Sequence, residues 1–196
     1  MCIRDSQSCV YDNHLICVDE ISAKDVTSAI KGLKNKHSVG PDGIPSYVYK
    51  GLQGFIIKPL MYIYNLSLKH QIFPCEWKIS KVSPLPKCQP AHDIKDYRPV
   101  ALPPMPAKIY ESILHGKLYE QLKHRIAPSQ HGFMKGRSVQ TNLINFTEYV
   151  STNLDEKKQV DVVYTDFSKA FDTVDHVLLI KKIGHVGFFR KINLTV

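Results

Sequence analysis

A single carboxylate, Asp166, comes directly after residues 160–165, a run rich in β-branched and aromatic side chains. Such a run favours a short, largely buried β-strand. A carboxylate where a buried strand ends is costly unless it is hydrogen-bonded, paired or metal-bound, and open α/β sheets place reactive groups there. Asp166 is therefore a candidate catalytic or metal-binding residue. The alternative is a structural aspartate that caps a helix beginning near Asp172 or faces water.

Two extended runs carry cations that suit contacts with phosphate groups. Residues 78–87 alternate apolar and polar side chains, and Pro84 and Pro86 restrict them to a sheet edge or a projecting finger. Residues 97–102 are a second extended run, reached through the polar residues 88–96. We expect a projecting hairpin that faces phosphate, with a lysine-guarded solvated edge as the alternative. Its cations are Lys78, Lys81, Lys87, Lys95 and Arg98.

Two glycine-containing loops are further candidates for binding anions. Residues 40–45 read Gly-Pro-Asp-Gly-Ile-Pro, which is typical of a tight turn whose glycines can adopt positive φ. The backbone N–H groups of this turn offer an alternative role as a phosphate cradle. Residues 130–138 form a basic loop in which Lys135 and Arg137 can attract a nucleic-acid backbone.

Helical periodicity predicts the elements that position these residues. A helix over residues 22–36 begins at Ser22 and Asp25, which have the spacing of a capping box. Further helices are expected over residues 46–52, 55–70, 106–125 and 138–154, and after Asp172 as far as Gly184. Residues 1–18 are expected to be a tail of little fold content.

Composition limits the class of protein. The 196 residues suit one domain, or one and part of another. With 43% hydrophobic and 22% charged residues the chain is globular, and its net charge of +8 is compatible with a polyanionic partner. Five cysteines without a Cys-x-x-Cys pair argue against a disulfide framework or a structural zinc site, and indicate a reducing compartment. No apolar run reaches the roughly 20 residues that cross a bilayer.

Five motifs in a fixed order resemble the reverse transcriptase domain of non-LTR retrotransposons, the RNA-directed DNA polymerases of LINE-type and jockey-type mobile elements. The resemblance covers residues 19–188, and group II intron and other bacterial-type reverse transcriptases share part of the set. The motifs are Gly-Pro-Asp-Gly-Ile-Pro (40–45), Pro-Leu-Pro-Lys (84–87), Tyr-Arg-Pro-Val (97–100), Gln-His-Gly-Phe (130–133) and Asp-Phe-Ser-Lys-Ala-Phe-Asp (166–172).

The resemblance implies a right-hand polymerase of the α+β class, helix-rich and with an incomplete sheet. Residues 19–127 would be the fingers, residues 128–196 the start of the palm, and residues 1–18 a disordered or non-native tail. The family's second palm motif, aromatic-x-Asp-Asp, is expected beyond Val196, because the chain contains no Asp-Asp pair. We therefore expect a fragment that lacks the thumb and endonuclease and is inactive alone.

Two other interpretations remain open at this stage. The first is a non-catalytic remnant that only holds RNA or an RNA–DNA duplex through its basic fingers. The second is an unrelated basic α/β domain in which Asp166 is structural. An open reading frame past Val196 with the aromatic-x-Asp-Asp motif would separate the enzyme from the remnant.

The resemblance also implies roles for individual residues. Asp166 matches the first catalytic aspartate of the palm, where it would hold two Mg²⁺ (or Mn²⁺) ions together with the backbone carbonyl of Phe167. Phe171 matches the aromatic gate that excludes a ribose 2′-OH by steric clash. Lys87 and Arg98 match the cations that grip the triphosphate. The nucleic acid would contact Lys78, Lys81, Lys135 and Arg137.

The implied partners are an RNA template, a DNA primer or target and a dNTP, with no membrane. The family implies an intracellular location, in the cytoplasm and nucleus. Asp172 and Asp175 do not match metal ligands of the family, and they are interpreted as the start of a helix, where the dipole favours negative charge.

Overall fold

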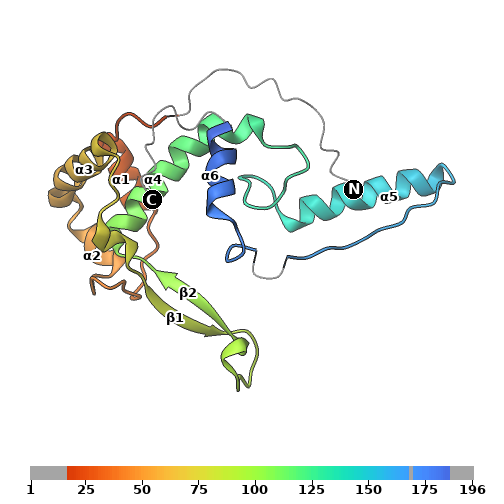
Figure 1. Ribbon diagram of the computed structural model, residues 1–196, viewed down its shortest axis with the longest axis horizontal. Coiled ribbons are helices and arrows are strands. Elements are labelled where there is room, and N and C mark those ends of the chain that lie inside the picture. Colours follow the sequence, from red (N-terminus) through yellow and green to blue (C-terminus); the bar gives the residue numbers. More distant parts are fainter. Residues whose placement is uncertain (1–16, 168–169, 186–196) are drawn as a thin grey trace. The chain divides into compact units, whose positions relative to one another are not determined.

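The structure, a computed structural model, describes residues 17–167 and 170–185. These residues form two compact units, an N-terminal unit of residues 17–120 and a C-terminal unit from residue 121 onward (Figure 1). The described chain is helix-rich with one two-stranded sheet, which agrees with the expected α+β class. None of the described helices combines the length and the apolar character needed to span a membrane.

The helices and strands follow the chain in a simple order. The helices are α1 (Ala23–Gly32), α2 (Ser46–Gly51), α3 (Gln53–His70), α4 (Met105–Leu122), α5 (Val139–Asp155) and α6 (His176–His185). The antiparallel strands are β1 (Lys81–Pro86) and β2 (Tyr97–Leu102). Short 3₁₀ turns are η1 (Cys75–Lys78), η2 (Ile94–Asp96) and η3 (Lys123–Arg125).

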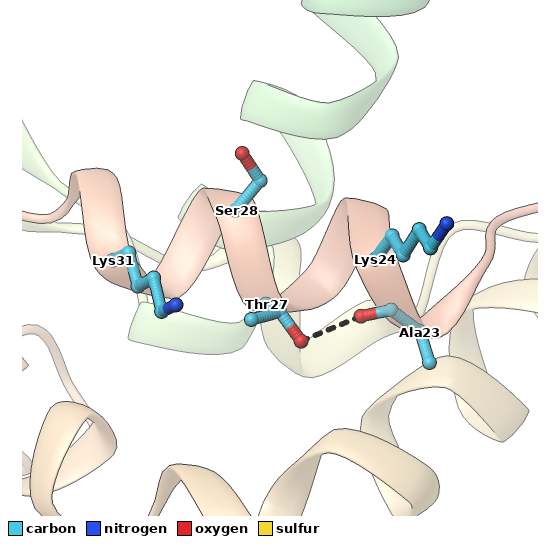
Figure 2. A pocket seen from close by; sticks show the side chains of 5 residues that line it. All are labelled: Ala23, Lys24, Thr27, Ser28 and Lys31. Atoms are coloured by element: carbon cyan, nitrogen blue, oxygen red, sulfur yellow. Dashed lines mark hydrogen bonds between the residues drawn. The ribbon is translucent and has the colours of Figure 1, made fainter.

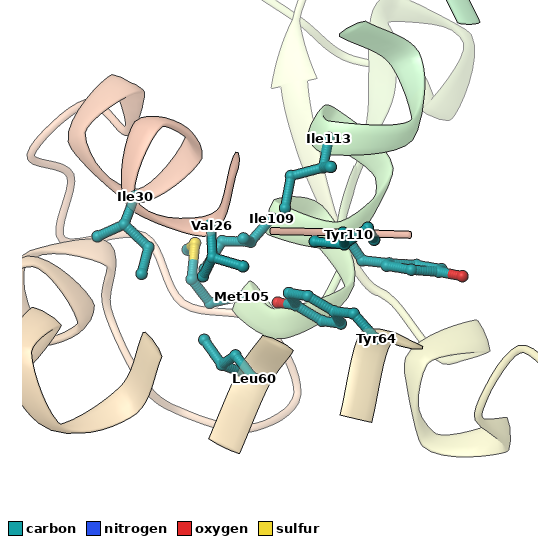
Figure 3. Close-up of a cluster of buried hydrophobic side chains, with 9 residues drawn as sticks. Val26, Ile30, Leu60, Tyr64, Met105, Ile109, Tyr110 and Ile113 are labelled. Carbon is teal, nitrogen blue, oxygen red and sulfur yellow. The ribbon is translucent and has the colours of Figure 1, made fainter. Parts of the chain in front are cut away.

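The hydrophobic core of the N-terminal unit lies where α1, α3 and α4 meet (Figure 3). Tyr64 of α3 is fully buried, and its hydroxyl donates to the carbonyl of Pro106 at 2.9 Å. Burial raises the pKa of Tyr64 far above its ordinary value, so this hydroxyl stays a donor. The core residues are Ile21, Val26, Ile30, Leu60, Tyr64, Met105, Ile109, Tyr110 and Ile113.

The predicted capping box of α1 is confirmed, but the helix ends earlier than predicted. Ser22 and Asp25 bond reciprocally, and the Ser22 N–H donates to the Asp25 carboxylate at 2.8 Å. Beyond Gly32, the buried Ser46 hydroxyl accepts from the Lys36 N–H at 3.1 Å and donates to the Lys34 carbonyl at 2.7 Å. In a longer helix, the backbone groups of Lys34 and Lys36 would bond to other helical residues. Here the Ser46 hydroxyl bonds to them, so α1 ends at Gly32.

Asp25 makes stability depend on acid pH. Burial raises its pKa, but hydrogen bonds from Ser22 and the Lys117 ammonium at 3.0 Å outweigh burial, and the pKa lies below its ordinary value. A lowered folded-state pKa stabilises the fold above the unfolded value of about 3.9, and this contribution disappears as the pH falls through the folded-state pKa. We expect Asp25→Asn to cost about 1 kcal/mol at pH 7.

Urea titrations of this chain at several pH values measure that cost. The difference between Asp25→Asn and the unsubstituted chain should shrink steadily below pH ~4. Glu111→Gln, which changes an exposed carboxylate of α4, is the matched control and should have little effect at any pH. A cost that stays constant down to acid pH would show that the Asp25 charge is not involved.

The predicted strand over residues 160–165 is wrong. Residues 158–167 have no regular secondary structure, and Val163 and Tyr164 are 84% and 81% exposed. A strand needs a neighbour for its N–H and C=O groups, and within residues 17–167 and 170–185 the strands β1 and β2 pair only with each other. The β-branched composition of residues 160–165 therefore did not suffice to form a strand. Asp166 does not follow a buried strand.

The other predicted elements are confirmed within a few residues at each end. The hairpin of residues 78–102 forms, although its first residues become the 3₁₀ turn η1. Of the two aspartates expected at a helix start, Asp175 accepts the Leu178 N–H at 2.9 Å and caps α6, whereas Asp172 lies in the preceding turn.

Candidate functional site

The β1–β2 hairpin brings two of the predicted phosphate-gripping residues onto one face. Leu85 lies directly opposite Arg98, and the Lys87 N–H continues the ladder by donating to the Asp96 carbonyl at 2.7 Å. Side chains alternate along a strand, and directly opposed residues share a face. Lys87 and Arg98 are therefore neighbours on the same face of the hairpin, which Figure 1 shows extending away from the helices of its unit.

Lys87 is held by the hairpin itself. Its ammonium donates to the Lys95 carbonyl at 2.6 Å. The nearby Asp96 carboxylate accepts the N–H groups of His92 and Asp93, both at 3.0 Å. These backbone bonds, with a smaller effect of the Lys87 charge, lower the pKa of Asp96. The ammonium is thus oriented before any anion arrives, beside an ionised carboxylate.

The remaining hairpin cations are solvent-facing. Lys78 ends η1, Lys81 begins β1 and Lys95 lies in η2, and all three are exposed, as is Arg98. Apolar side chains lie among them, of which Ile94 is 93% exposed. The exposed cations of the hairpin are suited to contacts with phosphate groups.

A second basic surface, which the sequence did not indicate, lies on α1. Side chains of this helix line a shallow pocket of about 310 Å³. Figure 2 shows these side chains. Lys24 and Lys31 supply its charge, and no carboxylate lines it. The Thr27 hydroxyl donates its proton to the Ala23 carbonyl at 2.7 Å, so it does not donate to an anion in this arrangement. The lining of the pocket therefore offers positive charge for an anion.

The Gly-Pro-Asp-Gly turn has a structural role in place of the phosphate cradle that was considered. The Asp42 carboxylate accepts the Met105 N–H at 3.2 Å, at the first residue of α4, and the Ile44 N–H at 3.3 Å. The Gly43 N–H donates to the Gly40 carbonyl at 3.1 Å, with Gly43 at φ +69°. The N–H groups of Gly43 and Ile44 are thus already satisfied, and the turn fixes the start of α4.

The basic loop of the C-terminal unit is organised by Arg137. One guanidinium nitrogen, Nη1, donates to the carbonyls of Pro128 at 2.6 Å, of Ala127 at 3.4 Å and of Gln130. Its charge was predicted to face nucleic acid, yet this nitrogen is committed to the loop backbone. The other loop cation, Lys135, is exposed.

His131 is a residue of this site to which sequence reasoning gave no role. Its Nδ1 lies 2.9 Å from the Thr141 hydroxyl and its Nε2 lies 3.2 Å from the Asn145 amide nitrogen. Thr141 and Asn145 are one helical turn apart on α5, so they share a face. In the sequence, the signal for this contact is the i, i+4 spacing of Thr141 and Asn145, because two polar side chains on one helical face can bond both nitrogens of one imidazole.

The described residues of the Asp166–Asp172 motif are solvent-facing in the C-terminal unit. Asp166 is exposed, and Phe167 and Phe171 are 83% and 79% exposed; residues 168 and 169 lie outside the described residues. The Phe171 ring meets the Phe133 ring edge-on, with centroids 6.2 Å apart and planes at 83°. The structure therefore brings the Gln-His-Gly-Phe loop beside the gate candidate of the acidic motif.

Two oxygen donors of the acidic motif have the chemistry that suits a divalent metal ion. The Asp166 carboxylate and the Phe167 carbonyl are hard oxygen donors of the kind that Mg²⁺ prefers. Within residues 17–167 and 170–185, no three His, Cys, Asp or Glu side chains come together. A two-metal site needs more carboxylates than Asp166 alone, so these residues do not complete one.

Comparisons with known proteins identify the family of this chain. The family model described as reverse transcriptase (RNA-dependent DNA polymerase) matches residues 85–195. A probable RNA-directed DNA polymerase from transposon BS of Drosophila melanogaster is 31% identical over 85% of this chain and 19% of its own length. A probable RNA-directed DNA polymerase from transposon X-element of the same species is 28% identical, over 81% of this chain and 18% of its own length.

A third relative comes from another species. The retrovirus-related Pol polyprotein from type-1 retrotransposable element R1 of Bradysia coprophila is 26% identical, over 84% of this chain and 16% of its own length. The chain spans about a fifth of the length of the curated relatives it matches. The family model covers Lys87, Arg98, Phe133, Asp166 and Phe171. The chain belongs to the reverse transcriptase (RNA-dependent DNA polymerase) family, in the branch of the non-LTR retrotransposons.

Proposed function

We propose that this chain is the part of an RNA-directed DNA polymerase that grips the incoming dNTP and supplies the first catalytic carboxylate. The reaction is nucleotidyl transfer from the dNTP to a primer 3′-OH, directed by an RNA template, with pyrophosphate as the leaving group. The observation that carries the proposal is the hairpin register, which puts Lys87 and Arg98 on one face. Residues 19–127 would be the fingers of this polymerase and residues 128–196 the start of its palm.

Lys87 and Arg98 would bind the triphosphate in different ways. The Lys87 ammonium is a compact charge that donates to the Lys95 carbonyl. It can donate to one phosphate oxygen in place of that carbonyl. The Arg98 guanidinium is a planar fork that can donate to two phosphate oxygens at once. Together they would neutralise negative charge and fix the phosphorus in line with the attacking hydroxyl. Lys78, Lys81, Lys135 and Arg137 would line the path of the nucleic acid.

Asp166 would hold Mg²⁺ (or Mn²⁺) together with the backbone carbonyl of Phe167, and the remaining ligands would come from outside the described residues. The metal would stabilise charge on the attacking and leaving oxygens. Phe171 would lie under the sugar and exclude a ribose 2′-OH by its bulk. Its exposed ring is available for such a contact.

Primer extension tests this function. A full-length polymerase that carries this chain is supplied with a primed RNA template, dNTPs and Mg²⁺, and cDNA is measured. Template-dependent extension that needs both the RNA and the metal is the expected result. RNA binding without extension, under conditions where a related polymerase extends, would favour the non-catalytic remnant.

Binding by the present chain gives a prediction that needs no catalysis. We expect weak, sequence-tolerant RNA binding that salt weakens steeply, because phosphate contacts release counterions. The double substitution Lys87→Gln, Arg98→Gln should lower the slope of log K against log salt by about 1.4, at about 0.7 for each lost contact with a single strand. Fluorescence anisotropy at several salt concentrations, on monomeric chain from a sizing column, measures it.

The matched control removes the same charge from the α1 pocket. Lys24→Gln, Lys31→Gln should reduce the slope by clearly less than the hairpin pair, although the net charge of the two variants is equal. Equal slopes would show that binding follows net charge and that the hairpin is not the preferred contact. A monomer without salt-sensitive affinity for RNA would contradict the proposed contact altogether.

A further inference from the structure

Two exposed aromatic rings from different motifs meet in the C-terminal unit. Phe133 belongs to the Gln-His-Gly-Phe loop and is 90% exposed, and Phe171 belongs to the acidic motif and is 79% exposed. Their centroids lie 6.2 Å apart with the planes at 83°. Edge-to-face contact is a favoured arrangement of aromatic rings because the positive edge of one meets the negative face of the other.

We propose that Phe133 is a positioning residue for Phe171, and that it sets sugar selectivity by holding the gate ring in one orientation. The inference rests on the proposed function, since selectivity needs an incoming nucleotide. A gate that works by steric clash excludes the 2′-OH only if its ring stays in place. Phe171 is largely exposed, so few other contacts restrict its ring.

The backbone conformation at Phe133 indicates that a specific geometry holds this ring at the surface. Its φ is +61°, in the left-handed region that bulky residues rarely adopt. Such a conformation persists only where the surrounding structure over-determines it, and such sites cluster where function requires a fixed geometry. Beside Phe133, the Gln130 side-chain amide donates to the Gly132 carbonyl at 3.1 Å and closes the turn.

The loop that carries Phe133 is braced at both ends. On its N-terminal side, Arg137 Nη1 binds three carbonyls of residues 127–130. On its C-terminal side, the Ser138 hydroxyl accepts the Thr141 N–H at 3.2 Å and the Thr141 hydroxyl accepts the Ser138 N–H at 2.9 Å, which fixes the start of α5. His131 links the loop to the Thr141 and Asn145 side chains of that helix.

These contacts fix the backbone from which the Phe133 ring projects. Its loop is tied to a helix of 17 residues, whereas Phe171 lies in a turn before α6. An edge-to-face contact between aromatic rings corresponds to an effect of roughly two- to tenfold. We therefore expect sugar discrimination to fall by about that factor when the Phe133 ring is removed.

The test measures the ratio of kcat/KM for a dNTP to that for the matching ribonucleotide, in a full-length polymerase that carries this chain. Phe133→Leu removes the ring and keeps an apolar side chain with the same backbone preference. It should lower the ratio about two- to tenfold, whereas Phe133→Tyr should preserve it. In a Phe171→Ala background, which itself lowers the ratio, Phe133→Leu should have no further effect.

Two outcomes of these kinetics would overturn the inference. One is an unchanged ratio for Phe133→Leu in an enzyme whose ratio does respond to Phe171→Ala. The other is an equal loss with and without the Phe171 ring, since a positioning residue acts through its target. A loss of kcat for both nucleotides without a change in the ratio would indicate a purely structural role.

A second measurement uses the present chain and does not depend on catalysis. Ring-current shifts in aromatic ¹H–¹³C NMR spectra report the contact, and Phe133→Leu should move the Phe171 ring signals toward random-coil positions. Unmoved signals would overturn the contact itself. If the contact is present but the full-length polymerase extends no primer, the proposed function fails and this inference fails with it.

Discussion

Asp166→Asn in a full-length polymerase that carries this chain is expected to lower primer extension on RNA by at least about a hundredfold, with the fold intact. Asparagine keeps the shape of the side chain but loses the charge that would hold a divalent cation. Because Asp166 is exposed, the substitution should change the free energy of unfolding by no more than about 0.5 kcal/mol. Steady-state incorporation with Mg²⁺ and urea unfolding measure the two effects separately.

Asp161→Asn is the matched control for this substitution. Asp161 is also exposed, belongs to the same irregular segment and loses the same charge. Its carboxylate accepts two hydrogen bonds from the Gln159 side-chain amide, which asparagine can retain in part. Near-normal extension is expected for this control. If Asp166→Asn keeps comparable Mg²⁺-dependent extension, or if both variants lose activity equally, Asp166 is not the metal-binding carboxylate.

Local sequence rules predicted most of the elements because these elements depend on short-range bonds. The α1 capping box is a bond between residues three apart, so Ser22 and Asp25 already define it. The hairpin follows from alternation and from prolines that exclude a central strand. Once the hairpin is correct, its register fixes the shared face of Lys87 and Arg98. The shared face of Lys87 and Arg98 can therefore be predicted from the sequence.

The features that local sequence rules did not predict depend on residues distant in the chain. The end of α1 is set by Ser46, which bonds the backbone of residues 34 and 36. The structural role of the Gly-Pro-Asp-Gly turn depends on Asp42, which is 63 residues from its partner Met105. The predicted strand over residues 160–165 failed because β-propensity reflects packing on a pleated surface, which those residues do not have here. Phe133 and Phe171 belong to two recognised motifs, yet no spacing rule relates their rings.

Gly40→Ala should destabilise the N-terminal unit strongly, because the Gly-Pro-Asp-Gly turn packs closely against the chain before α4. A Cβ at Gly40 would lie 2.6 Å from the Pro103 carbonyl oxygen, 2.9 Å from its carbon and 3.0 Å from the Pro104 nitrogen. All three are backbone atoms, which cannot rotate away as a side chain can. We expect a cost of about 1–3 kcal/mol, and a weakened bond between Asp42 and the Met105 N–H.

The matched control is Gly116→Ala in the interior of α4, which adds the same methyl group where nothing lies within 4 Å. Alanine costs less backbone entropy than glycine in a helix, so this variant should gain about 0.5–1 kcal/mol. Urea unfolding of both variants in this chain should therefore give midpoints that move in opposite directions. If Gly40→Ala instead unfolds at the same midpoint as the unsubstituted chain, the turn does not press against Pro103.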